Sequence, residues 1–198
     1  MLVVESGPFG RRFRLLETMR QYGAELLADL GHTDTFGERH AQWCLDEVTR
    51  IGALLTSHAE MEGNARLGEL WPNLRAAVDW ACITGDRHLA HALVAPVAPE
   101  IFVRNQNEIA DWVERILEIT PPDDEALVIF GLMWAARRYQ RNKNPEGYER
   151  LLDRYGEPDH PFLRYARSFV YQDNEQIEAA AVEAMAQGKF IAADLLSQ

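Results

Sequence analysis

The sequence predicts an all-α protein, an α-solenoid of antiparallel helix pairs, with one short β-hairpin at its N-terminus. Three observations lead to this fold class. Apolar residues recur at every third or fourth position along most of the chain, proline and glycine interrupt that pattern about every ten to twenty residues, and strand-like segments occur only before residue 16. Short polar turns between helices of this length favour antiparallel neighbours.

The N-terminal segment carries the strand signal and then changes its periodicity. Residues 2–4 and 11–15 favour strands and flank the turn-forming segment 5–10, which predicts a hairpin. From residue 15 the spacing becomes helical, and Gly31 stands where this helix would end. The apolar stripe of the helix consists of Leu15, Met19, Tyr22, Leu26 and Leu30.

The next helices are predicted from stripes and capping residues. A helix over 35–55 carries an apolar stripe, and another is expected to open at Pro72 and to stop at Gly85, because proline suits a first helical turn. Asp86 can cap a further helix, which Pro96 and Pro99 would interrupt.

The C-terminal half continues in the same manner. A helix over 109–117 ends before Pro121, and Asp123 or Asp124 caps a helix that reaches Tyr139. Three more helix starts are expected, at Pro145, Pro161 and Asn174. No repeat of fixed period is visible, so we expect a degenerate, tetratricopeptide-like array of roughly 35–45 residues per helix pair.

Composition and charge narrow the functional classes. Of the 198 residues 47% are hydrophobic, which is enough for a buried core. Asp and Glu number 31 against 20 Lys and Arg, and the net charge of −11 argues against nucleic-acid binding by the whole chain. No signal peptide and no stretch of roughly 20 apolar residues is present. The cysteines, Cys44 and Cys82, lack disulfide or zinc spacing, so a cytoplasmic location is expected.

Several blocks resemble one family of proteins. The run from Arg12 to Leu27 follows directly on the predicted hairpin, and it resembles a segment of large bacterial, especially actinobacterial, signal-transducing ATPases with a LuxR-type helix-turn-helix. The resemblance continues more faintly over roughly the first 115 residues, in Arg39-His40-Ala41, Asn73 to Ala81, Gly85-Asp86, Arg104, Glu108 and Trp112.

The resemblance implies a domain arrangement. In such regulators a nucleotide-binding ATPase module is followed by a winged-helix segment, a helical-repeat region and often the helix-turn-helix. Residues 1–31 would then be the end of the winged-helix segment, its last hairpin plus a helix, and residues 32–198 the helical-repeat domain. Met1 would lie inside the wing, so a fragment of a longer regulator is expected.

No complete catalytic motif is found in the sequence. The Gly188-Lys189-Phe190 run lacks the first glycine and the hydroxyl residue of a phosphate-binding loop, and neither a Gly-x-Ser-x-Gly nor a His-Glu-x-x-His motif occurs. His40 with Cys44, and His88 with His91, are spaced to share a helix face, but two ligands do not make a metal site. We therefore expect no enzyme activity, no cofactor and no metal in this chain.

Two groups of side chains are candidates for binding. Arg11, Arg12 and Arg14 surround the hairpin and could contact a DNA backbone, as a basic wing does. Trp80, Trp112 and Trp134 could line a groove for a partner, although aromatic residues at helical spacing more often belong to the core.

The predicted function is that of a non-catalytic helical-repeat module. It would couple a signal, a protein partner or a small effector to ATPase and DNA-binding domains outside this chain, and it would meet DNA only through the parent regulator. Two alternatives stay open: direct DNA binding through the basic hairpin, and a helical enzyme with an unrecognised site.

Overall fold

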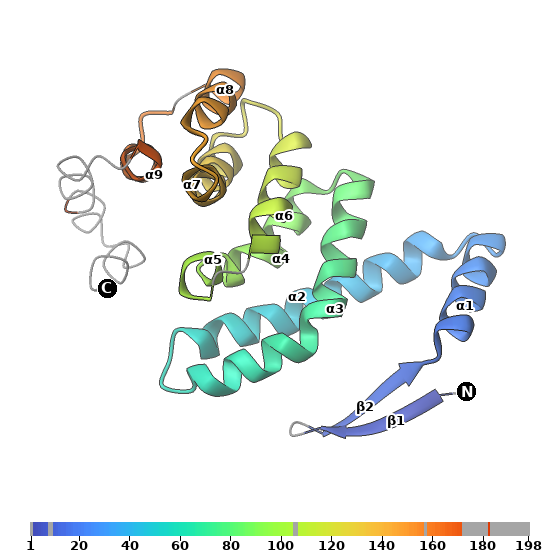
Figure 1. Ribbon diagram of the computed structural model, residues 1–198. Helices are drawn as coiled ribbons and strands as arrows, with labels where there is room; N and C mark the ends of the chain where they lie inside the picture. Colours follow the sequence, from blue (N-terminus) through green and yellow to red (C-terminus); the bar gives the residue numbers. More distant parts are fainter. Residues whose placement is uncertain (1, 8–9, 105–106, 157, 172–181, 183–198) are drawn as a thin grey trace. The chain divides into compact units, whose positions relative to one another are not determined.

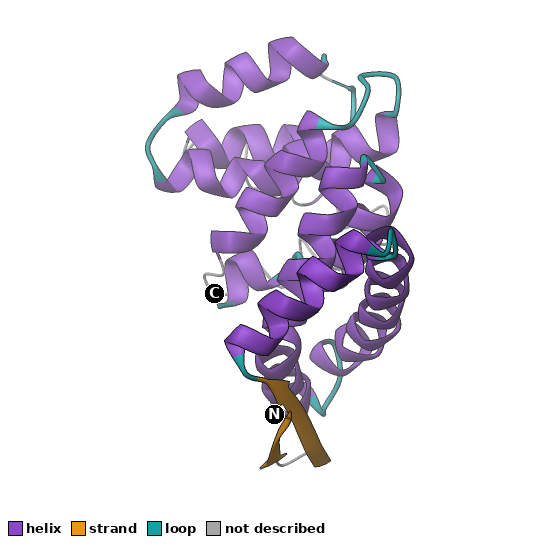
Figure 2. Ribbon diagram, turned by 90° about the vertical axis from the view of Figure 1, so that its right-hand side faces the viewer, coloured by secondary structure: helices purple, strands orange, loops and turns teal. Residues whose placement is uncertain are grey.

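The computed structural model describes residues 2–7, 10–104, 107–156, 158–171 and 182, which fall into two compact units, Met1–Trp80 and Ala81–Gln198. Helices dominate both units, and this confirms the all-α class; one two-stranded sheet accompanies them (Figure 2). The division between the units falls within a helix. The predicted domain boundary after residue 31 stays a prediction.

The N-terminal strands form an antiparallel pair. Strand β1 (Leu2–Gly7) pairs with β2 (Gly10–Leu15) in a register that runs from Leu2 opposite Leu15 to Gly7 opposite Gly10. Gly10 has a φ of +125°, a conformation that only glycine adopts without strain. The pair lies in the segment where the sequence predicted the hairpin.

Two helices follow the hairpin at once. Helix α1 (Glu17–Asp29) starts after Leu16, and Gly31, at a φ of +66°, ends it as predicted. Helix α2 (Thr33–Leu55) covers the predicted 35–55 segment, contacts α1, and buries one stripe, which consists of Ala41, Cys44, Val48 and Ile51.

Helix α3 (Glu60–Thr84) returns antiparallel to α2, and the two lie side by side in Figure 1. The Ser57 hydroxyl organises the turn, because it donates to the Leu54 carbonyl (2.9 Å) and accepts from the Ala59 N–H (3.1 Å). Close contact continues along the pair. A Cβ on Gly63 would lie 3.0 Å from Leu54, and one on Gly37 would lie 2.2 Å from the Trp80 indole nitrogen.

The expectation that a helix opens at Pro72 is wrong, since Pro72 lies inside α3. Proline lacks the N–H that would bond to the carbonyl four residues earlier, so a sequence rule places it at a helix start. Here the helix continues through the proline because its apolar face packs against α2. Leu67 and Leu70 before the proline are as buried as Leu74 and Ala77 after it, on one continuous face.

The second unit contains shorter helices. These are α4 (Arg87–Val94), the 3₁₀ turn η1 (Ala95–Val97), α5 (Glu100–Val103), α6 (Asn107–Glu118), α7 (Glu125–Arg141), α8 (Pro145–Tyr155) and α9 (Pro161–Tyr171). The Asp86 carboxylate accepts from the Leu89 N–H at 3.0 Å, which confirms the predicted cap of α4. Pro96 and Pro99 interrupt the helix after α4 as expected, since Pro96 lies in η1 and Pro99 directly precedes α5. The helix predicted to start at Asn174 lies outside the described residues.

Helix α7 is at the centre of the second unit and packs against α6, α8 and α9 (Figure 1). Its Gly131 lies against Leu117 of α6 so closely that a Cβ there would be 2.3 Å from the leucine side chain. Two buried hydroxyls connect α8 to its neighbours: Tyr148 donates to the Leu132 carbonyl (3.0 Å) and Tyr155 to the Leu117 carbonyl (2.5 Å). The tyrosines thus belong to the core while their polar ends remain satisfied.

Candidate interaction surface

Large apolar side chains are exposed throughout the N-terminal part of the first unit. Among the described residues, the first core residue along the chain is Ala41, and α1 has no buried residue. The exposed side chains are Val4, Phe13, Leu15, Leu16, Met19, Tyr22, Leu26, Leu30, Phe36 and Trp43. Scattered exposed leucines are ordinary, but a run that includes every large apolar position of one helix face indicates a surface for a partner.

The hairpin contributes one apolar face. Val4 lies directly opposite Phe13 in the register, and the two are 53% and 65% exposed. Leu15, two positions after Phe13, shares that face because side chains alternate along a strand. A two-stranded hairpin on its own is marginally stable, so this face is expected to need cover.

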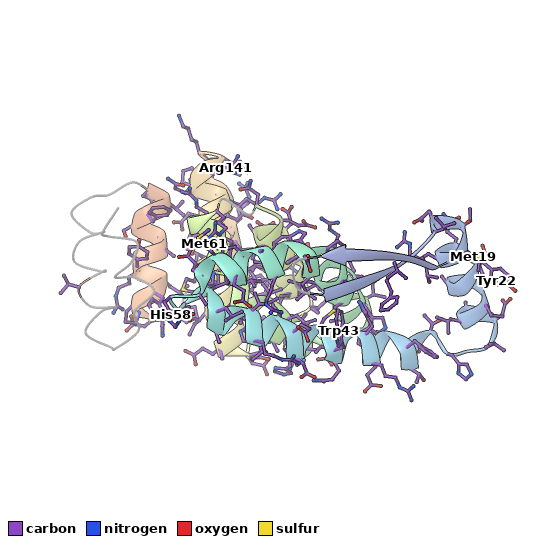
Figure 3. The ribbon with its side chains drawn as sticks, turned by 90° about the horizontal axis from the view of Figure 1, so that it is seen from below. Met19, Tyr22, Trp43, His58, Met61 and Arg141 are labelled. Atoms are coloured by element: carbon purple, nitrogen blue, oxygen red, sulfur yellow. The ribbon has the colours of Figure 1, made fainter. Side chains whose placement is uncertain are left out.

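Helix α1 contributes an apolar stripe, which we define as Leu16, Met19, Tyr22, Leu26 and Leu30. Each of these side chains is more than two-fifths exposed, and Tyr22 and Leu30 reach 60% and 57%. Figure 3 labels Met19 and Tyr22 on α1. The polar side of the helix has its own ion pair, from Arg20 to Glu17 at 2.8 Å.

Helix α2 adds a second group of exposed aromatic side chains. The Arg39 guanidinium lies 5.8 Å from the centre of the Phe36 ring, and the rings of His40 and Trp43 are 5.9 Å apart. Trp43 is 46% exposed and is labelled in Figure 3. Aromatic residues and arginine are the side chains that most often dominate binding energy at protein interfaces.

His40 and Cys44 lie close together, and their contacts are those of two packed helices rather than of a metal site. His40 Nε2 lies 3.3 Å from the Asn73 side-chain oxygen and 3.7 Å from the Cys44 sulfur, so the imidazole connects α2 to α3. Burial, with a smaller effect of Glu47, raises the pKa of Cys44 to about 12. A thiol with this pKa is protonated at neutral pH, which disfavours a nucleophile or a thiolate metal ligand.

The His88 and His91 side chains make different contacts. His88 Nε2 lies 3.7 Å from the Asp124 carboxylate, whereas the His91 ring meets the edge of Phe130 at 4.4 Å between centres. Desolvation, with the nearby His88, lowers the pKa of His91, which favours its neutral form. In the part of the chain that the structure describes, no group of three potential ligands gathers into a metal site.

Two of the three tryptophans that were predicted to line a partner groove are buried in the core. Trp112 is 2% and Trp134 3% exposed, so both belong to the core, the alternative that their helical spacing favoured. Trp80 is half-buried against Gly37 in the first unit. Sequence periodicity cannot separate core from groove here, because both patterns place aromatics on one helix face.

The predicted DNA contacts are described only through their backbone. Arg11, Arg12 and Arg14 lie in β2, where Arg12 is opposite Glu5 and Arg14 opposite Val3. Their side chains lie outside what the structure describes, so this prediction stays a prediction.

Arg138 and Arg141 lie in the last turn of α7. Arg138 pairs with both Asp111 (2.6 Å) and Glu114 (3.0 Å) of α6, and Arg141 bonds to Asn107. These contacts connect that end of α7 to α6. Desolvation raises the pKa of Glu114, although Arg138 opposes this effect.

The exposed surface was missed from the sequence for a simple reason. The stripe of α1 was found, but an apolar stripe is taken to face the protein's own core. The signal that could have revealed its exposure is the size of the elements around it, because a two-stranded hairpin and one short helix offer little surface to bury it.

Comparison with known proteins points to one class. No family model matches the chain, and no solved structure matches it. Three curated mycobacterial proteins, from Mycobacterium bovis and two strains of Mycobacterium tuberculosis, are each 36% identical to it over 122 residues. The match covers 59% of this chain, which spans about 13% of each relative's length.

The names of these relatives assign them provisionally to the HTH-type transcriptional regulators. The similarity therefore supports a transcriptional regulator as the class to which this helical chain is related. It does not extend to the ATPase or LuxR-type features that the sequence resemblance implies. None of the described helices is both long enough and apolar enough to cross a membrane.

Proposed function

We propose that the chain is a non-catalytic, tetratricopeptide-like module of a transcription regulator, which couples a signal or partner to ATPase and DNA-binding domains outside this chain. The packing of α7 carries the proposal. It contacts the preceding α6 and the following α8 and α9, as expected where helix pairs stack on their neighbours along the sequence. The names of the mycobacterial relatives support the regulatory role.

The mechanism of coupling would be rigid packing. Helix α6 is fixed to α7 by the Gly131–Leu117 contact and by Arg138, and to α8 by the Tyr155 hydroxyl. Elements connected in this way transmit a displacement because a close-packed core deforms little. A partner that binds one end of the array could bias domains at the other end.

We further propose that the chain holds no cofactor or metal, catalyses no reaction and acts in the cytoplasm. The raised pKa of Cys44 and the divergent contacts of His88 and His91 support the non-catalytic assignment. The test is an ATP hydrolysis assay on the purified chain. We expect no saturable activity; saturable hydrolysis that a point substitution within the chain abolishes would contradict the proposal.

The coupling role has a separate genetic test. We expect the reading frame around these codons to encode a phosphate-binding-loop domain upstream or a helix-turn-helix downstream. Stop codons that bound a 198-residue frame would exclude coupling within one polypeptide.

Direct DNA binding by the hairpin is the second candidate, and the register supports it. Arg12 and Arg14 occupy alternate positions of β2, and alternate strand positions share a face. A mobility-shift titration at physiological salt tests this. Sequence-preferring retention that disappears when Arg11, Arg12 and Arg14 become glutamine would favour DNA binding, whereas unshifted DNA would reject it.

A further inference from the structure

Helix α3 is bent, and a proline lies at its centre. Pro72 is the middle residue of the 25 that form the helix. Figure 1 shows α3 changing direction part-way along its length, and a straight helix would look straight from any side. Sharp changes of direction in helices almost always occur at proline. We define residues 60–67 and 73–84 as the first and second arms of α3.

The proline removes one backbone hydrogen bond between the arms. Pro72 has no N–H, so the carbonyl four residues earlier, at Gly68, loses its helical hydrogen bond, and the proline ring pushes that carbonyl aside. Both residues are exposed, so water can reach the carbonyl on this side of the helix. The helix therefore tolerates the missing bond, but it is held together less firmly here than along the arms.

The glycine at this turn is not required by packing. A Cβ added to Gly68 would meet nothing within 4 Å, whereas one added to Gly37 or Gly63 would have a neighbour at 3.0 Å or less. At an open position alanine would favour the helix. What glycine supplies instead is backbone freedom, because it adopts the widest range of φ and ψ. The most permissive residue thus lies one turn before Pro72.

Each arm of α3 has its own contact with α2. In the first arm, the position of a Cβ on Gly63 lies 3.0 Å from Leu54. In the second arm, the Asn73 side-chain oxygen lies 3.3 Å from His40 Nε2. The two contacts are separate, and no side chain lies against the exposed side at Gly68. A change in the angle between the arms therefore meets no obstacle on that side.

We propose that the turn from Gly68 to Pro72 is a hinge, at which the two arms of α3 change their angle while each arm stays helical. Hinges in proteins are a few residues that absorb changes in φ and ψ, and they are often small. Such a hinge lets the first unit change its shape without breaking a helix. It follows from the backbone of α3 alone, so it is independent of the coupling role.

Distances between two spin labels test the hinge. Met61→Cys and Ile83→Cys place the labels on α3 on either side of the turn, at positions where the native side chains are 88% and 81% exposed. Cys44 and Cys82 are buried, so the chain without these substitutions should take up no label. A straight helix would hold the two labelled Cα atoms roughly 33 Å apart. Double electron–electron resonance should give a shorter mean distance and a broad distribution.

Two substitutions should stiffen the hinge. Pro72→Ala restores the hydrogen bond, so we expect a narrower distribution and a mean distance longer by about 1–4 Å, the shift for straightening a kink of about 30–60° between arms of this length. Gly68→Ala keeps the proline but limits the backbone, and it should narrow the distribution with a smaller change in the mean.

Matched substitutions elsewhere serve as controls. Pro145→Ala removes a proline from the first turn of α8, and Gly23→Ala fills an equally open glycine position in α1 that no proline follows within a turn. Neither should change the mean distance or the width. Circular dichroism checks that each variant keeps its helices.

Hydrogen exchange gives an independent measurement. The amides of Trp71 and Asn73, which flank the proline, should exchange at least about fivefold faster than those of Val78 and Asp79 later in α3, the factor expected for the loss of one hydrogen bond. Pro72→Ala should remove the difference.

Three outcomes would overturn the hinge. One is a label distance in the unsubstituted background that is as long and as narrowly distributed as in Pro72→Ala. Another is an equal change in Pro145→Ala or Gly23→Ala. The third is equally slow exchange of the amides beside Pro72 and those of the second arm.

Discussion

At the scale of single residues, the close contact between two helices depends on a glycine, which has no side chain to hold the backbones apart. Gly131 in α7 is buried, and the position of its absent Cβ lies 2.3 Å from Cδ2 and Cγ of Leu117. The leucine has little room to move, because it is itself 1% exposed within the core. Even one methyl group should therefore force the two helices apart.

We expect Gly131→Ala to lower the free energy of unfolding by about 1–3 kcal/mol, the usual cost of overpacking a core. Gly68→Ala is the control: it adds the same methyl group to a helix where nothing lies within 4 Å, and should raise stability by up to about 1 kcal/mol. Urea unfolding monitored by circular dichroism measures both. A stabilised Gly131→Ala variant would show that α6 and α7 are not in close contact.

Asp124 connects the starts of α4 and α7 by charge. Its carboxylate lies 2.8 Å from Arg87 Nε and 3.7 Å from His88 Nε2. The hydrogen bond from Arg87 lowers the pKa of Asp124 below its ordinary value. A lowered folded-state pKa gives stability that is present above the unfolded value, about 3.9, and that is lost as the pH falls through the folded value.

Asp124→Asn should therefore flatten the acid limb of the stability–pH curve below about pH 4, with a loss of stability near neutral pH. Asp123→Asn, at the exposed neighbouring position, serves as the control and should leave the curve unchanged. Thermal unfolding at a series of pH values measures the effect. Parallel curves for Asp124→Asn and the unsubstituted chain would mean that the Arg87 pair does not stabilise the fold.

At the scale of elements, sequence and structure agree where a local signal decides. Asp86, Pro145 and Pro161 mark helix starts in both, and Gly31 marks a helix end, because capping needs only residues within a turn of each other. Agreement is lost where distant packing decides. The start of α3 and the exposure of the α1 stripe both depend on which helix lies beside which.

Pro72 gives the element-scale test. If proline began a helix, as the sequence predicted, Pro72→Ala would be neutral or slightly destabilising. Inside α3 it withholds a backbone hydrogen bond, so Pro72→Ala should raise the free energy of unfolding, by at most about 3 kcal/mol. Urea unfolding measures the change. A destabilised variant would place the helix start at Pro72 after all.

At the scale of the whole molecule, burial is distributed unevenly along the chain. No described residue before Ala41 is fully buried, whereas α6 and α7 each bury one full face. Local stability follows the number of buried apolar groups, so the N-terminal hairpin and α1 should open far more readily than the second unit. Composition alone could not predict this difference, because the apolar content of α1 is that of an ordinary core helix.

Native-state hydrogen exchange measures this gradient. We expect α1 amides to exchange at least about a hundredfold faster than those of α7, because opening α1 exposes no buried residue. Equal protection of α1 and α7 would mean that another surface covers the α1 stripe.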